Sequence, residues 1–162
     1  MMITMMMRTL SAASFLLLTV VSAHAQCVVG TNRGLAFDGG DHVAVPYSSA
    51  MSGFGDFTFE AWGRRTGLAA SGYGSLLTKW NYPSVAEYSF TTSASSILLS
   101  GAGGVQLITA PYSLDTNWRH FAVSRTGSTL QLFIDGASVA TATHAGIVGN
   151  ALTSYPTRIG VS

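Results

Sequence analysis

The clearest hydrophobic pattern in the chain is the alternation in residues 57–62, Phe-Thr-Phe-Glu-Ala-Trp. A period of two with aromatic and β-branched residues predicts a β-strand that packs one face against a core. One face of this strand carries Phe57, Phe59 and Ala61, and the other face carries Thr58, Glu60 and Trp62. Because an unpaired carboxylate is costly to bury, we expect the face of Glu60 to be polar, solvated or paired.

The same alternation recurs in short segments separated by glycine-rich turns. We predict further strands at residues 42–46, 75–80, 87–92, 97–99, 105–108, 118–125, 129–134, 137–143 and 158–161. Asp135-Gly136 is the strongest hairpin signal, because two-residue loops of this kind favour positive φ at both positions. No segment has the periodicity of an amphipathic helix. The pattern predicts an all-β fold, an antiparallel two-sheet β-sandwich.

The N-terminal segment has the features of a secretory signal peptide. Arg8 precedes an apolar run over residues 10–21, and Ala23-His24-Ala25 has the small-x-small pattern of a signal-peptidase site. The alternative is an uncleaved membrane anchor, but a spanning helix needs a longer run of ~20 apolar residues. We predict a signal peptide at 1–25, a leader at 26–34 and one domain at 35–162, in a secreted, extracellular or periplasmic protein.

Charge and cysteine content exclude several functional classes. Without residues 1–25 the chain has seven Lys and Arg against seven Asp and Glu, so its net charge is zero. We therefore expect no nucleic acid as a partner, and no stable membrane insertion once the signal peptide is cleaved. Cys27 is the only cysteine, which excludes an intrachain disulfide and a zinc site built from the cysteines of one chain.

Seven sequence blocks, in family order, resemble the laminin G-like (concanavalin A-like lectin/glucanase) domains. They are residues 35–46, 57–62, 77–81, 87–89, 118–123, 130–136 and 158–160. The resemblance implies a jelly roll of two packed antiparallel sheets in a secreted or cell-surface module that binds carbohydrate or protein. It also implies a calcium ion at the rim in many members, and frequent occurrence as part of a larger protein.

The chain departs from this family pattern at two places. The family carries a pair of acidic residues where this chain has Asp41-His42, and it continues into a further strand where this sequence stops at Ser162. We therefore expect the domain at 35–162 to be incomplete, without its last strand. Such a gap would leave backbone groups of a neighbouring strand unpaired and favour association.

No catalytic motif is complete in this sequence. A glycoside hydrolase would need two carboxylates roughly 5 to 9 Å apart across one sugar, but Glu60 and Glu87 lie in separate segments and no Glu-x-Asp-x-x-Glu signature is present. Residues 136–140, Gly-Ala-Ser-Val-Ala, lack the final glycine of a serine-hydrolase elbow. We expect a protein that is not an enzyme and has no catalytic residues, with a glycoside hydrolase as an alternative.

Aromatic side chains are the candidates for a carbohydrate surface, since aromatic faces stack on the apolar faces of sugar rings. We assign Trp80, Tyr82 and Tyr88 as ligand-binding residues. Trp62 and Trp118 lie inside alternating strands, where core packing is the expected role. His120 is expected to be a hydrogen-bonded sheet residue. Residues 64–65, Arg-Arg, are expected in a solvated loop, with contact to an acidic glycan as the alternative.

Asp38 and Asp41 are the candidate ligands for the calcium ion that the resemblance implies. Calcium takes six to eight oxygen ligands, and a glycine-rich turn can supply carbonyls as well as carboxylates. The alternative is that Asp38 bonds to backbone amides of its own turn. The expected function is recognition of a carbohydrate or an extracellular protein. The alternative is a structural or adhesive module of a larger surface protein, without a small ligand.

Overall fold

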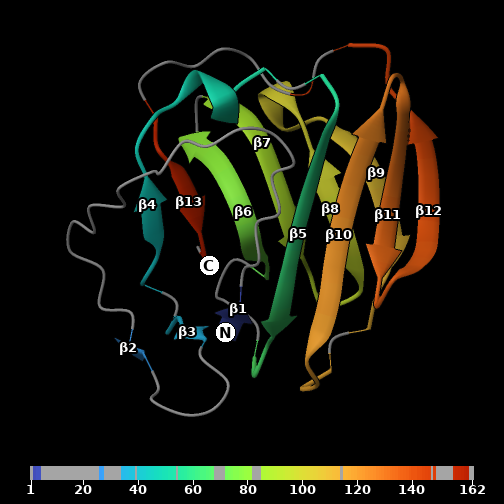
Figure 1. Cartoon of the computed structure of the whole chain (residues 1–162). Helices are drawn as coiled ribbons and strands as arrows, with labels where there is room; N and C mark the ends of the chain where they lie inside the picture. Colours follow the sequence, from blue (N-terminus) through green and yellow to red (C-terminus); the bar gives the residue numbers. More distant parts are fainter. Residues whose placement is uncertain are drawn as a thin grey trace, which may run out of the picture.

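The computed structural model describes residues 2–4, 26–27, 34–38, 40–53, 55–67, 72–81, 85–113, 115–146, 148 and 155–160. Strands and two short 3-10 turns make up this part of the chain, and no α-helix occurs within it (Figure 1). The elements are β1 (Met2–Thr4), β2 (Gln26–Cys27), β3 (Leu35–Ala36), β4 (Val43–Val45), η1 (Ser49–Met51), β5 (Phe57–Arg64), β6 (Gly74–Asn81), β7 (Val85–Thr92), β8 (Ser96–Ser100), η2 (Ala102–Gly104), β9 (Gln106–Pro111), β10 (Arg119–Thr126), β11 (Thr129–Ile134), β12 (Ala137–Thr143) and β13 (Thr157–Ile159).

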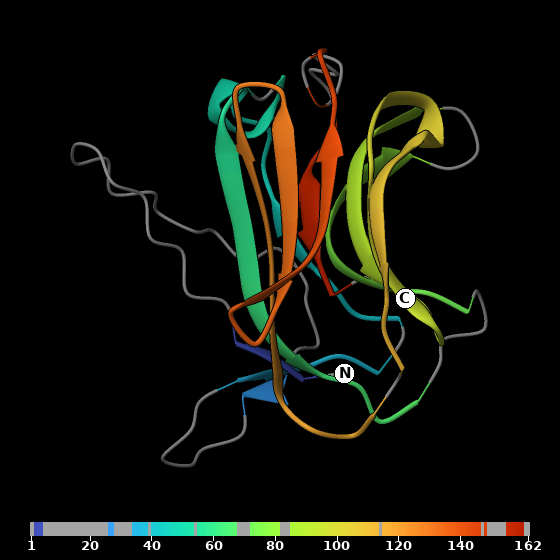
Figure 2. The ribbon, with the colours of Figure 1, turned by 90° about the vertical axis from the view of Figure 1, so that its right-hand side faces the viewer.

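The strands form two sheets that pack face to face (Figure 2). The seven-stranded sheet has the order β12-β11-β10-β5-β1-β3-β2, and the six-stranded sheet has the order β4-β13-β6-β7-β8-β9. Each described pairing of neighbouring strands is antiparallel. The antiparallel two-sheet sandwich that the alternation predicted is confirmed, and β5 lies at the centre of its sheet.

The alternating apolar residues of both sheets meet in one core. Phe59 of β5 packs against Tyr88 of β7 with ring centroids 5.4 Å apart, and this contact joins the two sheets. Phe121 and Leu132, from β10 and β11, are buried beside it, so the inward phase of these strands is the predicted one. The buried cluster consists of Phe37, Phe59, Ala61, Leu76, Leu77, Tyr88, Phe90, Ile97, Leu99, Ile108, Ala110, Tyr112, Phe121, Val123, Leu130, Leu132 and Val148.

The β11–β12 hairpin has the predicted two-residue turn. Asp135 and Gly136 have φ of 51° and 80°, which a loop with positive φ at both positions requires. A side-chain oxygen of Asp135 also accepts a hydrogen bond of 2.9 Å from the backbone amide of His120. The turn thereby holds the first residues of β10 in place.

Arg65 corrects the expectation that residues 64–65 lie in a solvated loop. β5 continues through Arg64, and the next inward position places Arg65 at 6% exposure. Its Nη1 donates to the backbone oxygen and to Oγ1 of Thr92, both at 3.0 Å. Burial lowers the pKa of Arg65, and the charge of Tyr112 acts in the opposite direction. Arg65 therefore ties the end of β5 to the other sheet.

The predicted processing of the N-terminus lies mostly outside the described residues. Of the predicted signal peptide, only Met2–Thr4 is described, and this strand pairs with β5 at Arg64, Gly63 and Trp62. Of the predicted leader, Gln26–Cys27 forms β2 and residue 34 precedes β3. In the described part of the chain no helix is long and apolar enough to cross a membrane. The division into signal peptide, leader and domain stays a prediction.

Candidate functional site

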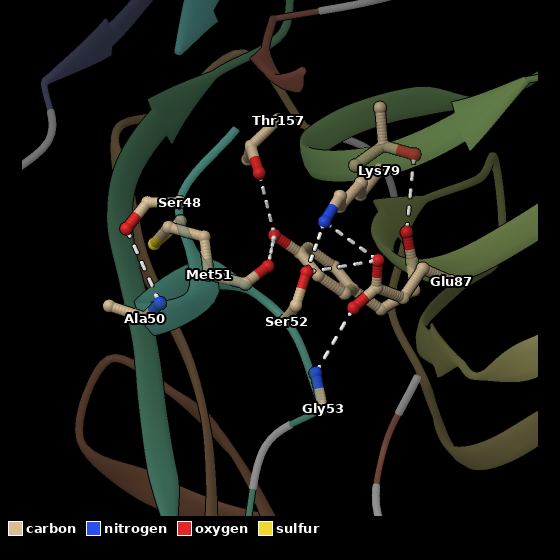
Figure 3. A network of polar contacts seen from close by, with 10 residues as sticks. Ser48, Ala50, Met51, Ser52, Gly53, Lys79, Glu87 and Thr157 are labelled. Atoms are coloured by element: carbon tan, nitrogen blue, oxygen red, sulfur yellow. Dashed lines mark hydrogen bonds and ion pairs between the residues drawn. The ribbon is translucent and has the colours of Figure 1, made fainter. Parts of the chain in front are cut away.

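A buried ion pair lies on the core side of β6 and β7, beside the segment that contains η1 (Figure 3). Lys79 Nζ is 2.8 Å from Glu87 Oε2, and the two side chains are 1% and 0% exposed. Glu87 also accepts hydrogen bonds from Ser52 Oγ at 3.3 Å and from the Gly53 amide at 3.1 Å. Lys79 donates to Ser52 Oγ, and its ammonium lies 4.7 Å from the ring centroid of Tyr47. Both charges are therefore compensated.

A register shift explains why a glutamate of β7 points inward. Lys79 pairs with Tyr88, whereas the next residue, Trp80, pairs with Ala86, so Glu87 is the extra residue of β7. A β-bulge re-aims the side chain of its extra residue. The carboxylate can consequently reach Lys79 on the same side of the sheet as Tyr88.

Tyr88 belongs to the same buried network. Its hydroxyl is 2.8 Å from Thr157 Oγ1 and donates to the backbone oxygen of Met51 at 3.3 Å. Burial raises the pKa of Tyr88 well above its usual value, while the hydrogen bond with Thr157 acts in the opposite direction. Since Tyr88 is 0% exposed and its ring packs on Phe59, it has no face for a ligand. Tyr88, which the sequence predicted to bind a ligand, therefore lies in the core.

The ion pair has the composition of a Ser-Lys dyad but not its chemistry. A serine nucleophile needs an adjacent base that can take its proton. Glu87 balances the charge of an ammonium, which has no lone pair for the proton of Ser52, and the same carboxylate also accepts from Ser52. Among the described residues the polar partners of Glu87 are Lys79, Ser52 and Gly53, so none is a second carboxylate. This geometry anchors the η1 segment to β6 and β7.

The side chains of β5 that point away from the core form an exposed aromatic surface on the seven-stranded sheet. We define the tryptophan face as three outward-facing residues of β5 and two residues at and just before the start of β10: Glu60, Trp62, Arg64, Trp118 and His120. Trp62 is 45% exposed, which makes it one of the most exposed large apolar side chains of the described residues. His120 is its cross-strand neighbour, with ring centroids 5.3 Å apart. His120 Nε2 also lies 3.6 Å from Glu60 Oε2.

The predicted core role of Trp62 is wrong. The inward positions of β5 are filled by Phe59 and Ala61, and Trp62 shares the outward phase of Glu60. Trp118 also lies on this side, where the guanidinium carbon of Arg64 is 5.7 Å from its ring centroid. The Nε of Arg64 is buried and has no hydrogen-bond partner among the described residues. Two indole rings, a cation and a Glu–His pair therefore share one face of the sheet.

Of the predicted ligand residues in the other sheet, Trp80 is half-buried. Its ring lies close to the η2 turn. A Cβ added at Gly104 would be 3.1 Å from the ring. Tyr82 lies outside the described residues. Arg158 of β13 faces outward on this sheet, between the inward-facing Thr157 and Ile159, and its Nε likewise lacks a partner in the described part of the chain.

The candidate calcium ligands lie at the turn before β4. Asp38 is exposed, and its Oδ1 accepts a hydrogen bond of 3.0 Å from the Gly40 amide, as the alternative interpretation of this turn predicted. Within the described ranges no three His, Cys, Asp or Glu residues are grouped so that they could hold a metal ion. The carboxylates of Asp38 and Asp41 alone fall short of the six to eight oxygens that calcium takes. The assignment of Asp38 and Asp41 as calcium ligands stays a prediction.

Comparison with known proteins agrees with the fold. The carbohydrate-binding module CBM66 from Bacillus subtilis has a TM-score of 0.53 at 14% identity, with 88% of this chain and 86% of that chain covered. The binding domain of Paraclostridial Mosquitocidal Protein 1 has a TM-score of 0.56 at 15% identity, with 88% of this chain and 43% of that chain covered. No curated protein sequence matches the chain. A family model described as the concanavalin A-like lectin/glucanases superfamily matches residues 37–162, most of the sequence. As the seven blocks predicted, the chain belongs to this superfamily and contains a laminin G-like domain.

Proposed function

We propose that this chain is an exported, non-catalytic module that binds a saccharide on the tryptophan face. The observation that carries the proposal is the 45% exposure of Trp62, an outward-facing residue of β5. Large aromatic side chains are normally covered, and an exposed one with ordered polar neighbours is typical of a recognition surface. Signal-peptide cleavage after Ala25 would be checked by N-terminal sequencing of the exported protein.

The chemistry of the face suits a sugar ring. The apolar face of a pyranose would stack on the indole of Trp62, and Glu60 and His120 would exchange hydrogen bonds with its hydroxyl groups. Glu60 Oε2 and His120 Nε2 lie 3.6 Å apart, so the two polar groups are next to each other on the face. No step of this proposal requires bond cleavage.

The energy available from Trp62 is large enough to dominate a weak saccharide complex. Its exposed fraction of 45% corresponds to about 110 Å² if a tryptophan presents about 250 Å². At ~25 cal/mol/Å² this area contributes at most about 3 kcal/mol. Since part of this energy offsets the loss of mobility on binding, we expect Trp62→Ala to weaken binding by about 30- to 150-fold.

The comparisons support the class of function. The solved structures similar to this chain include a carbohydrate-binding module and the binding domain of a mosquitocidal protein, and both are named for binding. A protein partner is the second candidate, because tryptophan and arginine are the residues that most often dominate protein interfaces. Arg64 and Trp118, in contact at 5.7 Å, would suit such a partner as well.

A glycan array followed by calorimetry separates these functions. The mature chain would be applied with and without calcium, and the tightest saccharide would then be titrated into the wild type, into Trp62→Ala and into Tyr73→Ala. Tyr73, an aromatic residue 51% exposed just before β6, serves as the matched control. We expect binding that Trp62→Ala weakens and Tyr73→Ala leaves unchanged. Equal affinities of the two variants, or the absence of any bound glycan, would overturn the proposal; cleavage of a bound glycan would overturn its non-catalytic part.

A further inference from the structure

We propose that the saccharide bound by the tryptophan face is acidic, and that its carboxylate pairs with Arg64. This inference rests on the proposed function and adds the class of ligand. The charges of the face are arranged in order along one strand. Glu60, Trp62 and Arg64 are successive outward-facing residues of β5, so that an anion and a cation flank the exposed indole.

Arg64 is held in position by an aromatic ring. Its guanidinium carbon lies 5.7 Å from the ring centroid of Trp118, a distance at which cation–π attraction acts. Such stacking limits the conformations of the side chain and leaves the edge of the guanidinium for hydrogen bonds. A planar guanidinium matches the two oxygens of a carboxylate. The stacked arginine is therefore prepared for a carboxylate before any ligand binds.

Arg64 is also the cation of this face that has no acidic partner in the described residues. Glu60 Oε2 lies 3.6 Å from His120 Nε2. Asp115 and Asp135 both pair with Arg119, at 2.5 and 2.7 Å. No ion pair joins Arg64 to a described carboxylate, and its Nε is buried without a hydrogen-bond partner in the same set of residues. A ligand carboxylate would supply the missing negative charge.

The order of charges also gives the ligand an orientation. Two residues of an antiparallel strand span ~7 Å, so a sugar ring on Trp62 has Arg64 on one side and Glu60 at a similar distance on the other. A carboxylate would be attracted at the Arg64 end and repelled at the Glu60 end, whereas neutral hydroxyl groups suit Glu60 and His120. Attraction at one end and repulsion at the other select one orientation of an acidic sugar.

The experiment compares two saccharides that differ in one group. A β-1,4-linked oligoglucuronate and the cello-oligosaccharide of the same length share a backbone, and only C6 changes from a carboxylate to a hydroxymethyl group. A charge-assisted bidentate pair predicts about 10- to 100-fold tighter binding of the oligoglucuronate to the wild type. Calorimetry would be done at low and at high salt, because the preference for the acid should weaken as salt screens the pair. Acidic and neutral glycans of other linkages would be compared on the array in the same way.

The variants test whether Arg64 causes the preference. Arg64→Ala should bring the two affinities to within about threefold, and Arg64→Lys should keep part of the preference, since lysine retains the charge but not the planar fork. Arg158→Ala is the matched control, because Arg158 also has an unpartnered Nε among the described residues but lies on the other sheet. Thermal melting would confirm that all variants fold.

Failure of this inference is distinguishable from failure of the proposed function. If the wild type binds neutral saccharides as tightly as acidic ones, or if Arg64→Ala retains the preference, the acidic ligand is refuted while Trp62-dependent binding stands. If neither class binds, or if binding does not depend on Trp62, the proposed function itself is refuted.

Discussion

The buried pair Lys79–Glu87 makes the most quantitative prediction. Lys79→Met would remove the ammonium and leave the Glu87 carboxylate 0% exposed, with the Ser52 hydroxyl and the Gly53 amide as its described donors. Glu87→Leu would leave the Lys79 ammonium, 1% exposed, with Ser52 and the ring of Tyr47. In each single variant one charge stays in the interior without a counter-ion.

The expected loss of stability follows from that uncompensated charge. Removing one partner of a buried ion pair lowers the free energy of unfolding by about 3–5 kcal/mol, because the remaining ion keeps its desolvation cost. A domain of this size is stable by ~5–15 kcal/mol, so each single variant should lose a large part of its stability. The double variant Lys79→Met/Glu87→Leu contains no buried charge, and replacing both partners by apolar residues is often close to neutral. We therefore expect strong coupling between the two sites.

Urea unfolding of the wild type, both single variants and the double variant would give this coupling as a double-mutant cycle. We expect the double variant to be more stable than either single variant, with a coupling energy of about 3 kcal/mol or more. Arg119→Gln is the control, because the ion pairs of Arg119 are about one-third exposed, and solvent screens such pairs so that they contribute little to stability. Losses below about 1 kcal/mol in the single variants, or a double variant that loses the sum of both, would refute the reasoning.

Three further predictions concern a glycine, a surface cluster and calcium. Gly160→Ala should lower stability by about 2–4 kcal/mol, from strain at positive φ and from overlap with Phe37. At Gly160 φ is 82° and a Cβ would lie 2.5 Å from the ring of Phe37. Gly136→Ala is the control: φ is 80° there but no atom lies within 4 Å, so this variant should show the effect of backbone strain alone. The hydrogen bond from Arg119 lowers the pKa of Asp115. Burial raises the pKa of Asp135, but the hydrogen bonds from the His120 amide and from Arg119 outweigh burial, so the pKa of Asp135 is lowered as well. The native state therefore binds fewer protons than the unfolded state, so this stabilisation is present above the ordinary value of 3.8 and is lost as pH falls below it. The melting temperatures of the wild type and Arg119→Gln should converge at low pH, and a constant difference would contradict the assignment. Millimolar calcium should leave the melting temperature unchanged; an increase that Asp38→Asn abolishes would show that the turn binds the ion after all.

The strands could be predicted from the sequence because their cause is local. Alternation at Phe59, Phe121 and Leu132 follows directly from the two-residue period of a strand, and these residues are buried as expected. The Asp135-Gly136 turn was equally predictable, since few residue pairs tolerate positive φ twice. Both features depend on neighbours within a few residues.

The candidate site was harder to predict, for two physical reasons. Glu87 points inward because β7 contains a bulge, and a shift in strand pairing leaves no trace in the local pattern. For Trp62 the alternation predicts the right face, the one that it shares with Glu60, whereas the preference of large aromatic residues for cores predicts the wrong one. The partner of Arg64, Trp118, comes from a distant segment and follows only from the pairing of β5 with β10.

The most direct test of the saccharide-binding surface uses the three tryptophans of the chain as separate probes. Their indole N–H signals would be recorded by ¹H–¹⁵N NMR while the tightest saccharide from the array is added, and Trp62→Phe would assign the key signal. We predict that the signals of Trp62 and Trp118 shift on binding and that the signal of Trp80, on the other sheet, stays in place. A shift confined to Trp80, or saturating ligand without any shift of Trp62, would contradict the account.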